Sequence, residues 1–526
     1  MHAITLKDVS KSHGARLLLD RVSLVVGAES RVGLVGPNGV GKTTLLRLLA
    51  GLDAPDSGSV LRSPPGLAVG YLPQELDARA GETLLAYLER RTGVARAAAE
   101  MDKLAARLPE AVAAYTDALE RFLALGGADL AARAAAACAE VGLTGRLDEP
   151  LGALSGGEAA RARLGAFLLA RFDVFCLDEP TNDLDFAGLE LLERFVAGLR
   201  GSLVVVSHDR AFLDRTVTRI VEIEEGSAKL REWSGGWSDY EAARGRAREA
   251  QYRRFTETED RRRELESLLR ERRGQARTGA TLAKRTGGAD RRGTHALQTK
   301  VRQAERALER LERAEKPFEP WRLQLSIAPR SRSGDVVVRL ERVVVERGSF
   351  RLGPLDLELR YGDRLNVTGP NGSGKTTLLH ALLGEVPLGS GRRTLGRSVV
   401  VGTIDQRRGR FAGTRPVLEE FAAESGWRSG DARTFLAKFG LGADDVLRPS
   451  RSLSPGERTR AALALAAARG VNCLVLDEPT NHLDLPAIEE LEAALETFAG
   501  TVVLVTHDRR LLERFAPTRE LPLGVG

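Results

Sequence analysis

Cysteine is scarce in this sequence, and its spacing argues against several kinds of site. Cys138, Cys176 and Cys473 are the three cysteines among 526 residues, and no two of them form a CxxC pair. Disulfide frameworks, zinc sites and cysteine-ligated iron–sulfur clusters use more closely grouped cysteines, so none of these is expected. The three thiols are expected to be small buried apolar residues.

Long apolar runs are also lacking. No uninterrupted stretch approaches the roughly 18 to 20 apolar residues of a membrane span, and the N-terminal MHAITLKDVS has no signal-peptide pattern. With 43% hydrophobic and 29% charged residues, the composition is typical of globular proteins. We therefore expect a cytoplasmic protein with no fused membrane domain, and the length predicts two or more domains.

A repeat organises the chain. The segment GPNGVGKTT at 36–44 returns as GPNGSGKTT at 369–377, 333 residues later. Three other motifs return after 299 residues, namely LSGGE (154–158) as LSPGE (453–457), LDEPTNDLD (177–185) as LDEPTNHLD (476–484), and SHDR (207–210) as THDR (506–509). This self-similarity predicts two related domains, at 1–237 and 331–526.

The first copy is longer than the second. It has 34 more residues between the glycine-rich segment and LSGGE, and Gln74 and Gln406 are 332 residues apart, so the extra length follows Gln74. Helix-forming residues from 83 to 125, with expected breaks at Thr92-Gly93 and Leu108-Pro109, predict a helical arm at about 88–125.

The segment between the copies holds the positive charge. Residues 241–317 contain 22 Lys and Arg against 13 Asp and Glu, whereas the whole chain has a net charge of +6. Five glycines from Gly274 to Gly293 indicate that the segment is not one continuous helix. We expect an α-helical hairpin linker at 238–330 with a basic tip at about 270–302, where ten positive and two negative residues occur.

Each glycine-rich segment lies between a β-type run and a helical run, which is the context of a phosphate-binding loop. Glycines allow backbone N–H groups to surround phosphates, a lysine reaches the β and γ oxygens, and the next threonine hydroxyl can bind Mg²⁺. These roles are expected for Gly36, Gly39, Gly41, Lys42 and Thr43, and again for Gly369, Gly372, Gly374, Lys375 and Thr376.

Acidic pairs end two apolar strands. Asp178 and Asp477 are expected at the carboxyl edge of a sheet, where Mg²⁺ would bind. Glu179 and Glu478 follow them and are positioned to polarise an attacking water, so neither site is expected to be degenerate.

A histidine follows a second apolar strand in each copy. His208 and His507 are placed to contact the γ-phosphate. A lone histidine at such a point is more often structural. Their paired spacing favours a functional role.

Together with Gln74 and Gln406, these motifs resemble the ATP-binding-cassette superfamily over nearly the whole chain. The resemblance implies an α/β fold of two tandem P-loop ATP-binding-cassette domains that hydrolyse ATP to ADP and phosphate. It also implies intramolecular head-to-tail pairing of the two cassettes, with Ser454, Gly456 and Glu457 completing the site of Lys42 and residues 155–158 completing that of Lys375.

The site residues that the motifs and this resemblance imply fall into three sets. The catalytic residues are Glu179, Glu478, His208 and His507. The ATP-binding residues are Gly36, Asn38, Gly39, Gly41, Lys42, Thr43, Thr44, Gln74, Ser155, Gly156, Gly157, Glu158, Gly369, Asn371, Gly372, Gly374, Lys375, Thr376, Thr377, Gln406, Ser454, Gly456 and Glu457. The Mg²⁺ ligands are Thr43, Gln74, Asp178, Thr376, Gln406 and Asp477.

Several positions depart from the superfamily pattern. The aromatic residue that usually stacks on adenine is replaced by His13 in the first copy and Arg347 in the second, which leaves base selectivity open. Pro455 replaces the first glycine of the second signature and removes one N–H donor. Asp183 occurs where the second copy has His482. We therefore expect two complete but unequal sites.

Three classes of ATP-binding-cassette protein compete as interpretations. A transporter ATPase would need a separate membrane protein, and such subunits usually lack a charged segment between fused cassettes. A DNA-repair ATPase would be expected to have zinc cysteines or a very long coiled coil inside a cassette. The fused cassettes, the arm and the basic linker instead resemble the F subfamily (ABC-F), whose members bind ribosomes.

The resemblance to ABC-F implies the ribosome as a partner, through its rRNA and a tRNA site such as the P site. The expected RNA-binding residues are Arg272, Arg273, Arg277, Lys284, Arg285, Arg291 and Arg292. The competing interpretation is a solvated linker, because charge runs usually have no further role. Antibiotic resistance by ribosome protection and general work in translation both remain open, as does the antibiotic class.

Overall fold

The computed structural model describes residues 2–74, 76–285, 302–303, 306, 332–348, 350–404 and 411–524, with the backbone alone at 272 and 275–285. The chain divides into two compact units, one of Met1–Trp237 with Leu323–Gly526 and one of Ser238–Arg322. The first unit contains both copies of the repeated motifs. Gln406, Arg291 and Arg292 lie outside the described residues.

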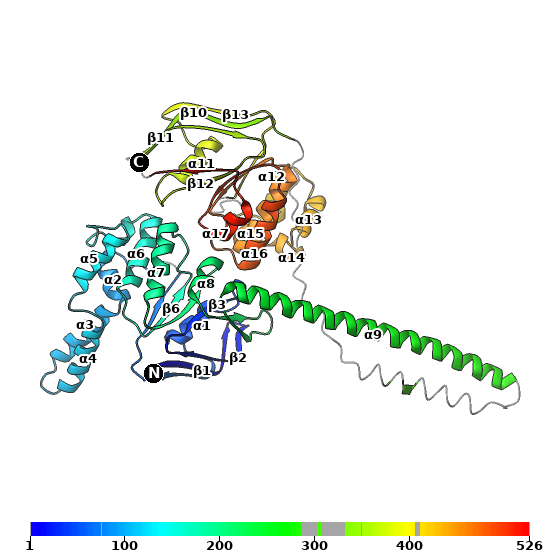
Figure 1. Ribbon diagram of the computed structural model, residues 1–526, viewed down its shortest axis with the longest axis horizontal. Helices are drawn as coiled ribbons and strands as arrows, with labels where there is room; N and C mark the ends of the chain where they lie inside the picture. The colour runs from blue at the N-terminus through cyan, green and yellow to red at the C-terminus, as the bar shows by residue number, and fades with distance from the viewer. Residues whose placement is uncertain are drawn as a thin grey trace. The chain divides into compact units, whose positions relative to one another are not determined.

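The first cassette is built on a six-stranded sheet in the order β5-β6-β7-β3-β8-β9; β3 and β6 of this sheet are labelled in Figure 1. Its strands are parallel except for β9, which pairs antiparallel with β8. The apolar runs of β6 and β7 are buried at every residue, as expected for strands covered on both faces. The strands are β3 (Arg31–Val35), β5 (Val69–Leu72), β6 (Val174–Asp178), β7 (Ser202–Val206), β8 (Arg219–Ile223) and β9 (Leu230–Ser234).

A second, antiparallel sheet of the first cassette has the order β2-β1-β4. Its strands are β1 (Ala3–His13), β2 (Arg16–Gly27) and β4 (Ser57–Ser63). The helices of this cassette are α1 (Lys42–Ala50), α2 (Leu84–Arg91), α3 (Val94–Ala105), α4 (Val112–Ala124), α5 (Leu130–Glu140), α6 (Gly156–Leu169), α7 (Phe186–Gly198) and α8 (Arg210–Thr216), with a 3₁₀ turn at Leu151–Ala153.

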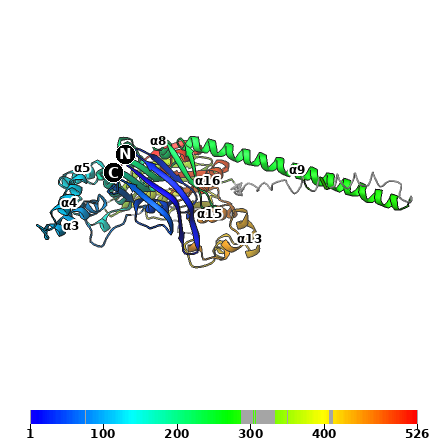
Figure 2. The ribbon, with the colours of Figure 1, turned by 90° about the horizontal axis from the view of Figure 1, so that it is seen from below.

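Helices α3 and α4 pack side by side, as Figures 1 and 2 both show. α2 ends where Gly93 adopts the left-handed conformation, with a φ of 82°. α3 ends at Ala105, three residues before Leu108-Pro109. Both helix breaks therefore occur where glycine and proline predict them.

The second cassette repeats this architecture, and its described residues, 332–348, 350–404 and 411–524, contain no counterpart of β9. Its parallel sheet has the order β14-β15-β16-β12-β17, and its antiparallel sheet has the order β11-β10-β13. The strands are β10 (Val336–Arg347), β11 (Phe350–Arg360), β12 (Arg364–Thr368), β13 (Ser390–Leu395), β14 (Val401–Ile404), β15 (Cys473–Asp477), β16 (Thr501–Val505) and β17 (Arg519–Pro522). The helices are α11 (Lys375–Leu383), α12 (Val417–Ser425), α13 (Ser429–Lys438), α14 (Ala443–Leu447), α15 (Pro455–Arg469), α16 (Leu485–Thr497) and α17 (Arg509–Phe515), with a 3₁₀ turn at Ser450–Ser452.

The helix α9 (Trp237–Arg285) contains 49 residues. It continues through Gly274 and Gly279, so the break predicted for this segment does not begin at those glycines. Each glycine weakens a helix by about 1 kcal/mol relative to alanine, and the Arg, Glu, Gln and Ala around them favour the helix enough to offset this. The three remaining glycines, Gly287, Gly288 and Gly293, lie outside the described residues.

The apolar core behind the first glycine-rich loop should contribute strongly to the free energy of unfolding. Leu46 of α1 is fully buried in a cluster of apolar side chains, whereas Leu61 of β4 is 56% exposed. Leu46→Ala should lower the free energy of unfolding by about 2–5 kcal/mol because it leaves a cavity. Leu61→Ala should change it by less than about 0.5 kcal/mol. Chemical denaturation of the two variants checks this, and equal losses would contradict the assigned core.

Candidate functional site

Each glycine-rich loop wraps around the ammonium group of its own lysine. Lys42 Nζ donates to the carbonyl oxygens of Gly36 at 2.7 Å and Pro37 at 3.1 Å. Lys375 Nζ repeats this with Gly369 and Pro370, at 2.7 and 3.1 Å. In both copies, the backbone therefore curls tightly before the helix that follows.

Glycine is required where that helix begins. Gly41 has a φ of 115° and Gly374 a φ of 95°. Residues that have a Cβ rarely adopt such positive φ angles. A Cβ on Gly374 would also lie 2.6 Å from the ring of Phe350. The sequence of each loop thus fixes the point at which α1 and α11 start.

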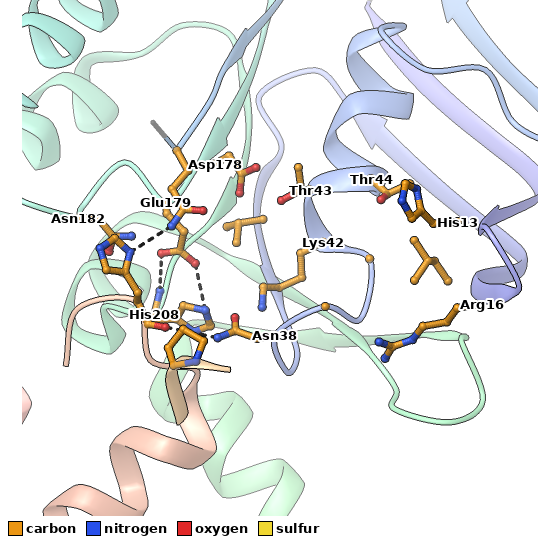
Figure 3. Close-up of a pocket in the computed structure, with 17 residues that line it drawn as sticks. His13, Arg16, Asn38, Lys42, Thr43, Thr44, Asp178, Glu179, Asn182 and His208 are labelled. Carbon is orange, nitrogen blue, oxygen red and sulfur yellow. Dashed lines mark hydrogen bonds and ion pairs between the residues drawn. The ribbon is translucent and has the colours of Figure 1, made fainter. Parts of the chain in front are cut away.

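The first loop lines a cavity of about 600 Å³. Figure 3 shows Glu179 and His208 on one side of it, His13 and Arg16 on the other, and Lys42 between them. The residues lining it are His13, Arg16, Leu18, Asn38, Gly39, Gly41, Lys42, Thr43, Thr44, Gln74, Asp178, Glu179, Asn182, Val206, His208, Pro455 and His482.

An acidic residue ends the central strand beside each loop. Asp178 accepts a hydrogen bond from the hydroxyl of Tyr71 at 3.1 Å. Asp477 accepts one from Thr376 Oγ1 at 2.8 Å. Because these carboxylates end β6 and β15, parallel strand order places them at the edge of the sheet next to α1 and α11.

The next residue in each copy is a glutamate held by the backbone of a histidine. Glu179 Oε2 accepts from the N–H of His208 at 3.2 Å, and Glu478 Oε2 accepts from that of His507 at 3.3 Å. Their φ angles, 48° and 46°, lie in the left-handed region, which is strained for glutamate. Strain of this kind persists where the surroundings over-determine it and concentrates at functional sites.

Burial governs the protonation of these groups. It raises the pKa of Glu179 and of Glu478 to about 8, and the neighbouring lysine ammonium opposes that shift in each case. Burial also lowers the pKa of His507 to about 4, and it holds the pKa of His208 well below the ordinary value. Both imidazoles are therefore neutral at pH 7.

The second loop lines a larger cavity of about 870 Å³. The first signature helps to form it: Ser155, Gly156, Gly157 and Glu158 all lie in its wall. The other residues lining it are Arg161, Thr181, Asn182, Asp183, Leu184, Leu189, His208, Asp209, Arg347, Phe350, Asn371, Gly372, Gly374, Lys375, Thr376, Thr377, Asp477, Glu478, Thr480, Asn481, Ile488, His507 and Asp508.

Reciprocal hydrogen bonds join each loop to the other cassette. The N–H of Asn38 donates to Asp484 Oδ2 at 3.1 Å, and that of Asn371 donates to Asp185 Oδ2 at 2.9 Å. The Asn371 amide also donates to the carbonyl oxygen of Asp183 at 2.9 Å. Asp484 and Asp185 are the N-caps of α16 and α7, so the start of each helix touches the loop of the opposite copy.

The second signature approaches the first cavity less closely than the first signature approaches the second. Pro455 lines the cavity at Lys42, whereas Ser454, Gly456 and Glu457 do not line it. Pro455 is the first residue of α15, where the missing N–H breaks no helical hydrogen bond. Ser454 and Glu457 form a capping box there, as Ser155 and Glu158 do in α6.

The remaining predicted residues occupy other positions. Gly36 and Gly369 accept the lysine hydrogen bonds without lining either cavity. Arg273 is exposed on α9, and the backbone of Arg272, Arg277, Lys284 and Arg285 lies in the same helix. Sequence reasoning missed Arg16, Tyr71 and Asn182. No motif marks Arg16 or Tyr71, whose role depends on chain segments that meet only in the fold, whereas Asn182 lies inside the LDEPTNDLD motif and its position there was the available signal.

Known proteins match this chain over most of its length. A family model described as ABC transporter matches residues 19–182 and 352–481. The tylosin resistance ATP-binding protein TlrC of Streptomyces fradiae is 38% identical, over 99% of this chain and 98% of that protein. The ABC transporter F family member 2 of Arabidopsis thaliana is 31% identical, over 97% and 75%. The energy-dependent translational throttle protein EttA of Escherichia coli K12 is 31% identical, over 95% and 88%.

A solved structure shares the fold. The archaeal ribosome recycling factor aABCE1, in its complex with the ribosomal stalk protein aP1, is 20% identical with a TM-score of 0.58, over 97% of this chain and 86% of that chain. Within the described part of the chain, no helix combines the length and apolar character needed to span a bilayer. From the family match and the full-length relatives, the protein is an ATP hydrolase that belongs to the F subfamily (ABC-F) of the ATP-binding-cassette proteins.

Proposed function

We propose that the protein binds ATP with Mg²⁺ at both sites and uses ATP to control its binding to the ribosome. At each site, the glycine-rich loop with Lys42 or Lys375 would hold the phosphates. The remaining ATP contacts would come from the lining residues named above and, at the first site, from the second signature. The observation that carries the ATP chemistry is the glutamate next to the strand-ending aspartate, which recurs in both copies with a side chain that is 6% exposed at Glu179 and 12% exposed at Glu478.

Glu179 and Glu478 would orient the attacking water and accept its proton. Their backbone N–H groups donate to Val206 and Val505 of the adjacent strands, at 2.9 Å in both cases. With the carboxylate also held by the histidine N–H, each side chain has little freedom to turn away from the cavity. His208 and His507 would contact the γ-phosphate through rings that burial keeps neutral.

The oxygen donors fit a magnesium ion. Asp477 and the hydroxyl of Thr376 lie 2.8 Å apart, and Asp178 and Thr43 occupy the same positions in the first cavity. Mg²⁺ prefers a few protein oxygens together with water and phosphate oxygens. When bound there, with Gln74 and Gln406 as further ligands, the ion would neutralise charge on the transferring phosphoryl group.

Adenine would stack on His13 at the first site and on Arg347 or Phe350 at the second. All three residues line the cavities, on the side away from the glutamates in the case of His13 (Figure 3). Stacking contacts the face of a base and not its edge, so we expect modest discrimination between ATP and GTP.

ATP would also draw the cassettes together. The hydrogen bonds of Asn38 to Asp484 and of Asn371 to Asp185 support head-to-tail pairing, because each joins a phosphate-binding loop to the opposite cassette. The first signature in the wall of the second cavity supports it as well. Hydrolysis would then loosen the paired state.

Relatives that act in translation support the ribosome as partner. EttA is named as a translational throttle, and TlrC as a tylosin resistance protein, and both match nearly the full length of this chain. The basic linker supports RNA contact. Residues 270–302 contain ten basic and two acidic residues, whereas residues 257–266 of α9 contain three basic and five acidic residues. In the paired state the linker would enter a tRNA site, such as the P site, which would place the protein in the cytoplasm.

Replacing the two glutamate carboxyl groups by amides tests both ATP hydrolysis and its proposed use in ribosome binding. Glu179→Gln/Glu478→Gln should lower ATP turnover by roughly a hundredfold or more, since the base is lost while the shape is kept. The variant should then co-sediment with ribosomes in ATP and not in ADP.

A matched control is available on α7 and α16. Glu190 and Glu489 are exposed and 299 residues apart, so Glu190→Gln/Glu489→Gln makes the same chemical change outside both cavities. It should keep turnover near that of the unmodified protein. If Glu179→Gln/Glu478→Gln loses turnover but is not retained on ribosomes by ATP at moderate salt, the proposed ribosome binding is contradicted and the proposed ATP hydrolysis is not.

Salt dependence tests RNA contact by the basic tip. Arg272→Gln/Arg273→Gln/Arg277→Gln should weaken ribosome binding and reduce the slope of log K against log salt by roughly 0.7 to 0.9 for each phosphate that is no longer neutralised. Arg261→Gln/Arg262→Gln/Arg263→Gln removes the same charge from the part of α9 in which acidic residues outnumber basic ones, and should leave that slope nearly unchanged. Equal slopes for the two triple variants would contradict a specific role for the tip.

The 38% sequence identity to TlrC favours a second, narrower function, which is protection of the ribosome from an antibiotic. Expression in a susceptible host should raise the inhibitory concentration of a macrolide, a lincosamide or a pleuromutilin, and the double glutamine variant should not. If none of the three concentrations changes while ribosome binding is retained, general work in translation is the better assignment.

A further inference from the structure

Two arginine–glutamate pairs join the cassettes at equivalent positions. Arg210 of α8 makes a two-pronged contact with Glu492 of α16, with Nη1 3.2 Å from Oε2 and Nη2 bonded to Oε1. Arg509 of α17 contacts Glu193 of α7, with Nη1 2.5 Å from Oε1. The two arginines are 299 residues apart, as are the two glutamates, so the repeat has produced the pair twice in opposite directions.

The pairs differ in burial. The side chains of Arg210 and Glu492 are both 1% exposed, whereas those of Arg509 and Glu193 are 17% and 16% exposed. A buried ion pair adds little to the free energy of unfolding, because the cost of removing both charges from water is about as large as their mutual attraction. A two-pronged guanidinium–carboxylate contact does fix orientation. The pair is therefore better suited to fixing the relative orientation of the two helices than to stabilising the contact between the cassettes.

Each arginine stands next to an ATP site. Arg210 is the first residue of α8 and lies two residues after His208, whose N–H holds Glu179. Arg509 has the same relation to His507 and Glu478. A shift of α8 or α17 would therefore move the histidine that holds the glutamate.

Each glutamate lies on the helix that also touches the opposite glycine-rich loop. α16 begins at the N-cap Asp484, which accepts from Asn38, and carries Glu492 eight residues later, about 12 Å along the helix. One helix of the second cassette thus contacts both the loop and the histidine segment of the first site. α7 does the same for the second site through Asp185 and Glu193.

We propose that Arg210–Glu492 and Arg509–Glu193 are positioning pairs, through which a helix of each cassette aligns the glutamate and histidine of the opposite ATP site. α16 follows Glu478 by seven residues and α7 follows Glu179 by seven, so each helix is attached to one site and aligns the other. Hydrolysis at one site then depends on the state of its partner. This inference rests on the proposed roles of Glu179 and Glu478.

The test measures turnover at one site at a time. Glu478→Gln leaves the first site active and Glu179→Gln leaves the second. In these backgrounds, Glu492→Gln should slow the first site by roughly tenfold, as expected when a catalytic group is displaced, and change the second by less than about twofold. Glu193→Gln is its matched counterpart and should slow the second site instead.

This crossed pattern separates positioning from a general structural role. A substitution that only weakened its own cassette would slow the site whose glutamate that cassette carries, so that result, or equal slowing of both sites, would overturn the proposal. If Glu179→Gln and Glu478→Gln themselves leave turnover unchanged, the roles of the glutamates fail. The inference alone fails if those roles hold and the crossed pattern is absent.

A second variant distinguishes loss of alignment from loss of stability. Glu492→Gln leaves the Arg210 charge buried beside a neutral group and should lower the melting temperature. Arg210→Met/Glu492→Leu removes both charges of the pair and should regain thermal stability, yet turnover at the first site should stay roughly tenfold slow because the fixed orientation is gone. Recovery of both stability and turnover in the double variant would show that the pair only avoids a buried lone charge, and would overturn the proposal.

Discussion

The carboxylates of Glu179 and Glu478 lie in positions where burial makes a negative charge unfavourable. Glu179 is 5% exposed, follows a fully buried strand and has a backbone conformation that glutamate rarely adopts. Burial would keep such a group protonated, and the ammonium of Lys42 and the N–H of His208 oppose this. The loop that curls around Lys42 and the backbone of His208, two residues after β7, both act on this one side chain. The second copy solves the same problem with Lys375, Glu478 and His507.

Many of these features can be predicted from the sequence because they are local. The spacing of glycines in 36–44, the aspartates that end apolar strands, and the glycine and proline at the ends of α2 and α3 all act within a few residues. That 274–293 is not one continuous helix stays a prediction, because residues 286–293 lie outside the described part of the chain. Gly274 and Gly279 do not break α9, since the residues around them favour a helix more than two glycines disfavour it.

The rest depends on segments that meet only after folding. Tyr71 reaches Asp178 across 107 positions of sequence, and Arg210 reaches Glu492 across 282. No local pattern distinguishes these side chains from other tyrosines and arginines. The repeat does contain a signal for the pairs, because SHDR and THDR share an arginine at the 299-residue spacing, and the same spacing relates Glu193 to Glu492.

The fold also shows how the two sites differ. Pro455 lines the first cavity from the second signature, whereas four residues of the first signature line the second cavity. The ring of Phe186 packs edge-on against His507 at 5.0 Å between centroids, and the corresponding residue of the second copy is Leu485, which has no ring. Asp183 lines the second cavity and His482 the first, so the two cavities present different charges to a bound phosphate.

The central claim is that each ATP site is completed by the opposite cassette. Hydrogen–deuterium exchange in ATP tests it most directly when Lys42→Ala is added to the Glu179→Gln/Glu478→Gln protein, since this substitution removes the lysine–phosphate interaction of the first site alone. Protection by ATP should then be lost at 482–492, on the second cassette, and retained at 183–193, on the first. Loss of protection at 183–193 with retention at 482–492 would contradict it.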